Sequence, residues 1–181
     1  MTSEFNSVVS VAIPPRSGIA HIYKSLNLSD AFSICLPPGA CGNPEVLARF
    51  ILSHQPAWIS WLMKIRDMMV LGFGLKTATQ LATLAADGNT DRMGIFKIYS
   101  RNEMEIIVGE DDKHLNFRIS ILCLTGTTPK SNRRVVVSTV VHCHNRLGRA
   151  YIFVIAPFHR MVVRSGLFRA ARAGWPIAPS R

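Results

Sequence analysis

Three histidines are the first residues in this sequence that could do chemistry. His142 and His144 point to one face of a candidate strand, because side chains alternate along strands. Two such imidazoles can bind Zn²⁺ if His114 or Cys35 supplies a third ligand, or they can act as acid and base. No HExxH or CxxC motif accompanies them, and a strand end that hydrogen-bonds into the next helix explains the same pattern. We keep the three histidines as catalytic candidates and predict no metal and no cofactor.

Other ionisable groups give weaker indications of catalysis. The acidic turn Glu110–Asp112 could hold a cation or act as a base, but EF-hand spacing is absent. The favoured interpretation is a solvated hairpin turn whose charges meet the helix arginines described below (Arg146, Arg149, Arg160 and Arg164), because ion-paired acids are common without catalysis. Cys143 lies on the opposite strand face from the neighbouring histidines, which argues against a Cys–His dyad. No GxSxG or P-loop motif is present, so the sequence favours a protein that is not an enzyme.

The charges are divided unevenly along the chain. Its 181 residues are 48% apolar and 18% charged, which excludes a disordered chain. Residues 1–112 hold 9 basic and 11 acidic residues, a net charge of −2, whereas residues 113–181 hold 12 basic residues and no acid, a net charge of +12. Four of these basic residues fall on one face of a predicted helix and are called the arginine seam: Arg146, Arg149, Arg160 and Arg164.

The arginine seam could bind an anionic surface or an acidic partner, because the guanidinium fork suits carboxylate and phosphate. Nucleic-acid binding would need exposed aromatic residues interleaved with the basic ones and a recognisable module. The nearby aromatic residues, Tyr151, Phe153 and Phe158, are mostly interpreted as core, which argues against nucleic acid. Residues 147–163 are otherwise almost all apolar, so we expect the sheet to bury the rest of this helix. A bilayer-binding helix would need a broad exposed apolar face, which that burial would remove. If the protein has a membrane-interfacial element, the sequence favours the tail, Gly166–Arg181, with Arg169, Arg172 and Trp175.

The predicted location is the cytoplasm. The longest apolar run, Ala150–Phe158, is too short to span a bilayer, so the protein is predicted not to be transmembrane. The N-terminus lacks the pattern of a signal peptide, and four scattered cysteines do not suggest a disulfide framework. A homodimer is compatible with the sequence.

Local patterns in the first half predict one strand followed by helices. Alternating apolar residues predict a strand at Asp30–Leu36. An Asn-Pro-Glu start predicts a helix over Pro44–Ser53, and apolar residues at helical spacing predict another from Pro56 to about Leu71, with a short helix at 77–86. Residues 1–28 show no clear period and are interpreted as an N-terminal extension or a loosely packed lead-in.

A period of two then predicts four strands that form an antiparallel meander: Met93–Ser100, Glu103–Gly109, Leu115–Leu124 and Arg133–His144. A polar loop, 125–132, separates the last two strands. The final element is a helix over about Arg146–Ala173, in which Pro157 should produce a kink or a break. Antiparallel strands with segregated helices mean an α+β fold, with one domain at 29–173 and a tail at 174–181.

Three stretches carry a resemblance to a known family. They read RMGIF from Arg92, GEDDKHLNFR from Gly109, and HNRLGRAY from His144, the last continuing to Pro157–Arg160. Together they resemble the bacterial family called domain of unknown function 2867, over about Asp30–Ala171. The family implies no activity, so it assigns no catalytic residue.

The element order separately resembles the helix-grip fold of the START and Bet v 1-like (SRPBCC-type) proteins. In that fold a curved antiparallel sheet grips a long C-terminal helix, two short helices follow the first strand, and an apolar ligand often occupies the space between. The five clear strands fall short of that fold, so a further strand is expected within 8–24 or 73–91. The resemblance implies a pocket, with His159 or Arg118 orienting a polar head, lined by Ile95, Phe117, Ile119, Val137 and Phe158.

Three functional hypotheses follow. The first is a module that binds a small apolar or amphipathic molecule in this pocket. The second is a cyclase- or isomerase-type enzyme on the same scaffold, with His114, His142 or His144 as acid and base. The third is an interaction module that docks an acidic partner on the arginine seam. A histidine and a carboxylate within hydrogen-bond reach inside the pocket would favour the second hypothesis.

Overall fold

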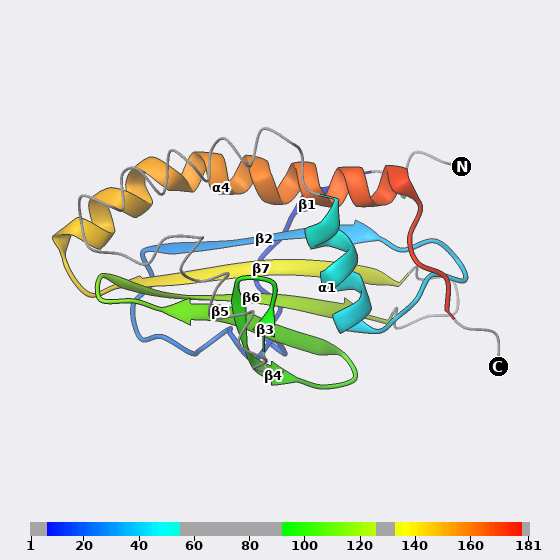
Figure 1. The fold of residues 1–181 in the computed structure, drawn as a ribbon, viewed down its shortest axis with the longest axis horizontal. Coiled ribbons are helices and arrows are strands. Elements are labelled where there is room, and N and C mark those ends of the chain that lie inside the picture. The colour runs from blue at the N-terminus through cyan, green and yellow to red at the C-terminus, as the bar shows by residue number, and fades with distance from the viewer. Residues whose placement is uncertain (1–6, 55–91, 126–132, 179–181) are drawn as a thin grey trace.

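One curved antiparallel sheet, with a long helix along one of its faces, organises the protein (Figure 1). The computed structural model describes residues 7–54, 92–125 and 133–178. The strand order is β1-β2-β7-β6-β5-β4-β3. The strands are β1 (Val9–Ser10), β2 (Leu28–Cys35), β3 (Arg92–Met93), β4 (Phe96–Arg101), β5 (Glu105–Asp111), β6 (Leu115–Leu124) and β7 (Arg134–Cys143). The helices of the described residues are α1 (Pro44–Ser53) and α4 (Arg146–Ala173), so the predicted α+β class is confirmed.

The strands of the predicted meander are present, with one correction. The expected strand Met93–Ser100 is two strands, because a two-residue turn separates the paired residues Met93 and Phe96. Gly94 in this turn has φ +59°, a conformation that glycine adopts without steric cost. The additional strand expected within 8–24 is β1, which pairs antiparallel with β2.

Helix α1 begins and ends at the predicted residues. The Asn43 side chain accepts hydrogen bonds from the backbone N–H groups of Glu45 (2.9 Å) and Val46 (3.1 Å), which caps the helix. Leu47 and Ala48 are buried against the sheet. The predicted helices at Pro56–Leu71 and 77–86 lie outside the described residues, as does most of the loop at 125–132.

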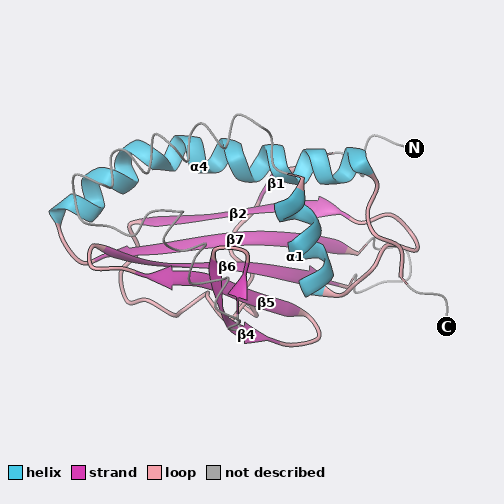
Figure 2. Cartoon of the chain, viewed as in Figure 1, coloured by secondary structure: helices cyan, strands magenta, loops and turns pink. Residues whose placement is uncertain are grey.

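Helix α4 has the predicted bounds. It runs through Pro157 without a break but bends in its N-terminal half (Figure 2), so of the two predicted effects of this proline the break is absent. Pro157 is on the solvent side, so the Phe153 carbonyl that loses its helical donor is on the exposed face. The expectation that the sheet buries everything but the arginine seam is wrong, because the Phe153 residue is 84% exposed. The sheet can cover only one side of a helix that packs on it, and the covered side of α4 is narrow.

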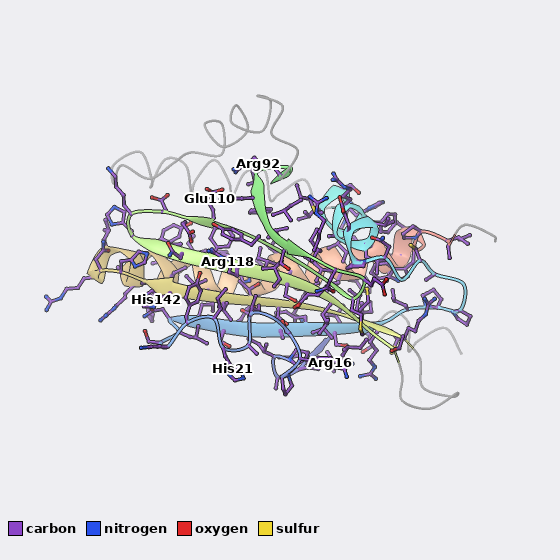
Figure 3. All side chains as sticks on the ribbon, turned by 90° about the horizontal axis from the view of Figure 1, so that it is seen from below. Arg16, His21, Arg92, Glu110, Arg118 and His142 are labelled. Atoms are coloured by element: carbon purple, nitrogen blue, oxygen red, sulfur yellow. The ribbon has the colours of Figure 1, made fainter. Side chains whose placement is uncertain are left out.

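The two faces of the sheet have different cover. The inner face carries the main core, in which residues of β2, β6 and β7 pack against α1 and α4: Phe32, Ile34, Ile121, Val135, Val137, Leu47 and Leu167. The outer face is covered by the chain before β2, where Ile19 packs on Ile107 and Val140. Figure 3 shows Arg16 and His21 of this segment on the other side of the sheet from Arg92 and Glu110.

The segment before β2 is therefore more than a loose lead-in. Ser17 and Ile19 are buried, and the buried Glu105 carboxylate accepts hydrogen bonds from the Ser17 hydroxyl (2.6 Å) and the Gly18 amide (3.0 Å). The Ser120 hydroxyl donates to the same carboxylate. At the other end of the chain, Trp175 is buried in the main core.

Replacing Glu105 with alanine is expected to lower the free energy of unfolding by about 2 kcal/mol, because buried donors would lose their acceptor. Urea denaturation measures the loss, and hydrogen exchange at the Ile19 amide should accelerate as the segment detaches. Glu103→Ala is the matched control, since Glu103 is exposed two residues away. Equal stability losses in the two variants would contradict this role for Glu105.

Candidate functional site

A cavity of about 210 Å³ lies between the inner face of the sheet and α4. Three α4 residues spaced four apart, Tyr151, Ile155 and His159, form one wall. Alternate residues of β6 and the turn between β3 and β4 form the others. The complete lining is Leu28, Ile95, Phe96, Glu110, Asp112, Leu115, Phe117, Ile119, Thr139, Val141, Tyr151, Ile152, Ile155 and His159.

Buried polar atoms without hydrogen-bond partners lie at one part of this mostly apolar cavity, where Thr139 and His159 line it, and on Asp30, which does not line the cavity but neighbours both residues. The Thr139 hydroxyl, both Asp30 carboxylate oxygens and His159 Nε2 are buried and have no such partner among the described residues. Asp30 and Thr139 are cross-strand neighbours on β2 and β7. His159 Nε2 lies 3.5 Å from Asp30 Oδ1, and Arg160 Nε lies 3.6 Å from Asp30 Oδ2. Both distances give electrostatic attraction but leave room for shorter hydrogen bonds to a bound molecule.

A buried ion pair lies at another side of the cavity. Arg92 Nη2 is 2.8 Å from Glu110 Oε2, and the two side chains are 11% and 13% exposed. The same guanidinium donates to the Ile95 carbonyl, which fixes the turn between β3 and β4. Ile95, Glu110 and Asp112 all line the cavity. The pair therefore shapes the wall of the cavity and neutralises a carboxylate at its edge.

The acidic turn that the sequence singled out is an ion-paired hairpin. Glu110 pairs with Arg92, and Asp111 accepts from Arg118 at 2.8 and 3.1 Å. The arginine seam was expected to supply such partners, and for these two acids it does not. Among the described residues no group of three or more histidines, cysteines and acids is arranged to hold a metal ion.

The structure brings together four of the predicted pocket residues: Ile95, Phe117, Ile119 and His159 line the cavity. The other three lie elsewhere. Val137 packs in the main core, the Phe158 residue is 41% exposed, and Arg118 lies on the outer face.

Sequence reasoning missed Asp30 and Thr139, although a signal was present. Each is a polar residue within an alternating apolar pattern, Leu28–Ile34 for Asp30 and Val135–Cys143 for Thr139. A polar residue on an otherwise apolar strand face marks either a satisfied buried group or a binding site.

Arg118 is held on the outer face by a carboxylate and an aromatic ring. Its guanidinium lies 3.5 Å from the centre of the Tyr99 ring and binds Asp111, which also accepts from the Tyr99 hydroxyl. Burial and this hydrogen bond raise the pKa of Tyr99 to about 12. Burial alone would raise the pKa of Asp111, but hydrogen bonds from Arg118 and Tyr99 outweigh it and hold that pKa below its ordinary value. Arg118 stabilises this cluster and cannot orient a molecule in the cavity.

Two of the three candidate histidines contact each other: the rings of His142 and His144 pack edge to face, with 5.3 Å between centroids, as their shared strand face predicts. Among the described residues they do not form a metal-binding group with a third histidine, cysteine or acid. The His142 ring stacks on Tyr23, with 5.6 Å between centroids, and His144 Nε2 lies 3.0 Å from Asn116 Oδ1. His114 Nδ1 lies 2.7 Å from the Asn145 amide nitrogen beside the start of α4. Each has a local structural partner, which matches the strand-end alternative considered from sequence.

Burial disfavours the thiolate form of two cysteines, Cys123 and Cys143. Burial raises the pKa of Cys143, which packs beside Leu115 and Ile152, and burial also raises the pKa of Cys123 to about 11. Because only the thiolate attacks or binds metal readily, both thiols are poor nucleophiles.

The arginine seam is exposed along α4. Arg160 is 3.6 Å from Asp30, whereas Arg146, Arg149 and Arg164 have no acidic partner among the described residues. No helix in the described part of the chain is both long and apolar enough to cross a bilayer.

Comparisons with known proteins identify a family without an assigned activity. Searches of the curated proteins and of the solved structures gave no match. One family model, described as protein of unknown function (DUF2867), matches residues 22–166, which include all three stretches that suggested the resemblance. The chain belongs to the DUF2867 family.

Proposed function

We propose that the protein binds a small, mostly apolar molecule with one polar group in the cavity between the sheet and α4. The observation that carries this proposal is the set of unsatisfied buried atoms on Thr139 and His159, which line the apolar cavity, and on Asp30, which neighbours both. A buried polar atom without a partner costs free energy, and a ligand hydroxyl or carbonyl placed here would recover it.

The volume limits the size of the molecule. An engineered apolar cavity of about 150 Å³ binds benzene, and typical ligand pockets begin near 300 Å³. At about 210 Å³, this cavity suits a single substituted ring or a short acyl chain.

The placement of the family stretches supports the same site. The stretch from Arg92 supplies Ile95 and Phe96, the stretch from Gly109 supplies Glu110 and Phe117, and α4 supplies His159. Residues far apart in sequence thus surround one cavity. The architecture is also consistent with the helix-grip resemblance, in which this space holds the ligand.

A matched pair of probes tests the polar end of the cavity. We expect p-cresol to bind more tightly than p-xylene, because the two differ by one hydroxyl in place of a methyl group of similar size. Thr139→Val keeps the shape of the side chain but removes its hydroxyl. We expect the affinity for p-cresol to fall roughly three- to tenfold, which corresponds to the loss of one hydrogen bond, and the affinity for p-xylene to stay unchanged. Isothermal titration calorimetry measures both affinities.

Ser138→Ala is the control, because Ser138 also carries a buried hydroxyl without a partner but belongs to the outer face of the same strand. Binding of neither probe, together with no apolar molecule in native mass spectra of the purified protein, would refute the proposal. Equal effects of the two substitutions on p-cresol would show that the hydroxyl of Thr139 does not contact the ligand.

A second candidate function rests on the Asp30–His159 pair. A carboxylate beside an imidazole is an acid–base arrangement, and this one adjoins the cavity, which favours the isomerase-type hypothesis with His159 as the acid–base residue in place of the three histidines predicted. The test is catalysed exchange of the methyl protons of acetophenone with deuterated solvent, monitored by NMR. Exchange that His159→Gln and Asp30→Asn both abolish, with p-cresol binding retained, would support catalysis; no exchange above buffer would exclude it for this substrate class.

A further inference from the structure

The solvent side of α4 carries an unusual amount of exposed apolar surface. Five large residues there are between 41% and 84% exposed: Phe153, Val154, Phe158, Met161 and Phe168. At about 100° per residue they fall within an arc of roughly 140°, so they form one stripe, which we call the apolar stripe. Single exposed apolar residues are ordinary, but a continuous stripe marks a contact surface.

Basic residues border this stripe on both sides. The arginine seam follows one edge, and Arg169 follows the other. No acidic residue occurs anywhere in the 28 residues of α4. An apolar stripe edged by arginines is the arrangement of a helix that lies in the interface of an anionic bilayer, with its arginines on lipid phosphates.

An open groove adjoins the seam edge of α4. It measures about 640 Å³ and is lined by Ser7 and Val8 on one side and by Pro157, Arg160, Met161, Arg164, Ser165 and Phe168 on the other. Arg160 and Arg164 are one helical turn apart, so two guanidinium groups line a groove that also has apolar walls. This combination fits a lipid phosphate with the start of its acyl chains.

We propose that α4 docks the protein on the surface of an anionic lipid bilayer, with the apolar stripe inserted at the headgroup level and the arginine seam on lipid phosphates. The charge of the helix selects an anionic partner. The aliphatic side chains of Val154 and Met161 lie among the three phenylalanines of the stripe and cannot stack on bases, and the sequence contains no recognisable nucleic-acid-binding module, which favours lipid over nucleic acid. The proposal stands on the outer side of α4 and does not depend on a ligand in the inner cavity.

Vesicle co-sedimentation tests the proposal. The full chain should bind vesicles of phosphatidylcholine mixed with phosphatidylglycerol and not vesicles of phosphatidylcholine alone, and binding should weaken as salt rises. The double substitution Arg149→Glu/Arg164→Glu should reduce affinity at least roughly tenfold, since each arginine near such a surface contributes strongly. Phe153→Asp should reduce it as well, because it places a charge within the stripe.

Two further measurements separate the bilayer from other occupants. The tryptophan introduced by Phe153→Trp adds fluorescence to that of the wild-type protein. This added fluorescence should shift to the blue on anionic vesicles and be quenched by brominated lipids, and binding of an acidic protein or a nucleic acid would not cause that quenching. The control Arg16→Glu/Lys24→Glu makes the same charge change on exposed residues of the outer-face segment and should leave binding nearly unchanged.

Several results would overturn the proposal. These are equal binding to both vesicle types, equal losses in the two double variants, or binding to duplex DNA but not to anionic vesicles. A dimer in sedimentation velocity that Phe153→Asp converts to monomer would assign the stripe to a second copy of the chain. All the variants should have wild-type melting temperatures, because the substituted side chains are exposed.

Discussion

Replacing Gly148 with alanine is expected to destabilise the protein by about 3 kcal/mol. Gly148 is in the first turn of α4, and a Cβ there would lie 2.3 Å from the His114 carbonyl oxygen and 3.3 Å from Cys143 Cβ. Alanine favours helix by up to about 1 kcal/mol over glycine, but that gain is smaller than the cost of displacing a backbone carbonyl. That carbonyl also accepts a hydrogen bond from the His144 amide, so it cannot move without loss.

Chemical denaturation measures this effect, and Gly42→Ala provides the comparison. A Cβ at Gly42 would meet only the guanidinium end of Arg133, at 3.0 Å, and a flexible side chain can move away. We expect the Gly42 variant to lose less than about 1 kcal/mol. A Gly148→Ala protein as stable as wild type would show that α4 does not approach the β5–β6 turn as closely as described.

Replacing Arg92 with leucine is expected to cost about 3 kcal/mol, because Glu110 would remain buried without its partner. The Ile95 carbonyl would also lose its donor, so the turn between β3 and β4 should loosen. Since Ile95 and Glu110 line the cavity, p-cresol binding should weaken in the same variant.

A double substitution separates the ion pair from packing. Arg92→Leu/Glu110→Leu removes both charges and should recover much of the lost stability, because an apolar pair needs no partner. Arg49→Leu is the exposed counterpart: Arg49 also lies 2.8 Å from its partner, Glu45, but its side chain is 56% exposed. That variant should lose less than about 1 kcal/mol. Similar losses for Arg49→Leu and Arg92→Leu would contradict the importance assigned to burial.

Both sites proposed for this protein use α4, on opposite sides. Tyr151, Ile155 and His159 face the cavity, while Phe153 and the other residues of the apolar stripe face solvent. The two proposals can therefore be tested separately, because p-cresol affinity and vesicle affinity should respond to different substitutions. Thr139→Val should leave vesicle binding unchanged, and Phe153→Asp should leave p-cresol binding unchanged.

Much of the secondary structure could be predicted because its signals are local. The Asn-Pro-Glu start located α1, and the period of two located β6 at its observed bounds. The prediction merged β3 and β4, since one glycine in a two-residue turn interrupts the period only slightly. Four of the seven predicted pocket residues line the cavity, and two of these, Phe117 and Ile119, lie on the inner face of the sheet.

What the sequence could determine by itself was the class of each element and which strand residues share a face, because period and capping act over a few residues. Tertiary structure alone decided which residues meet. Asp30 lies beside Thr139 and His159 only because β2 pairs with β7 and α4 crosses above them. The exposure of Phe153 could not be predicted from sequence either, because an apolar helix residue is expected in the core unless the covering sheet is known to be too narrow to reach it. The pairing register of distant strands and the position of α4 on the sheet bring these residues to their sites, and no short stretch of sequence encodes either.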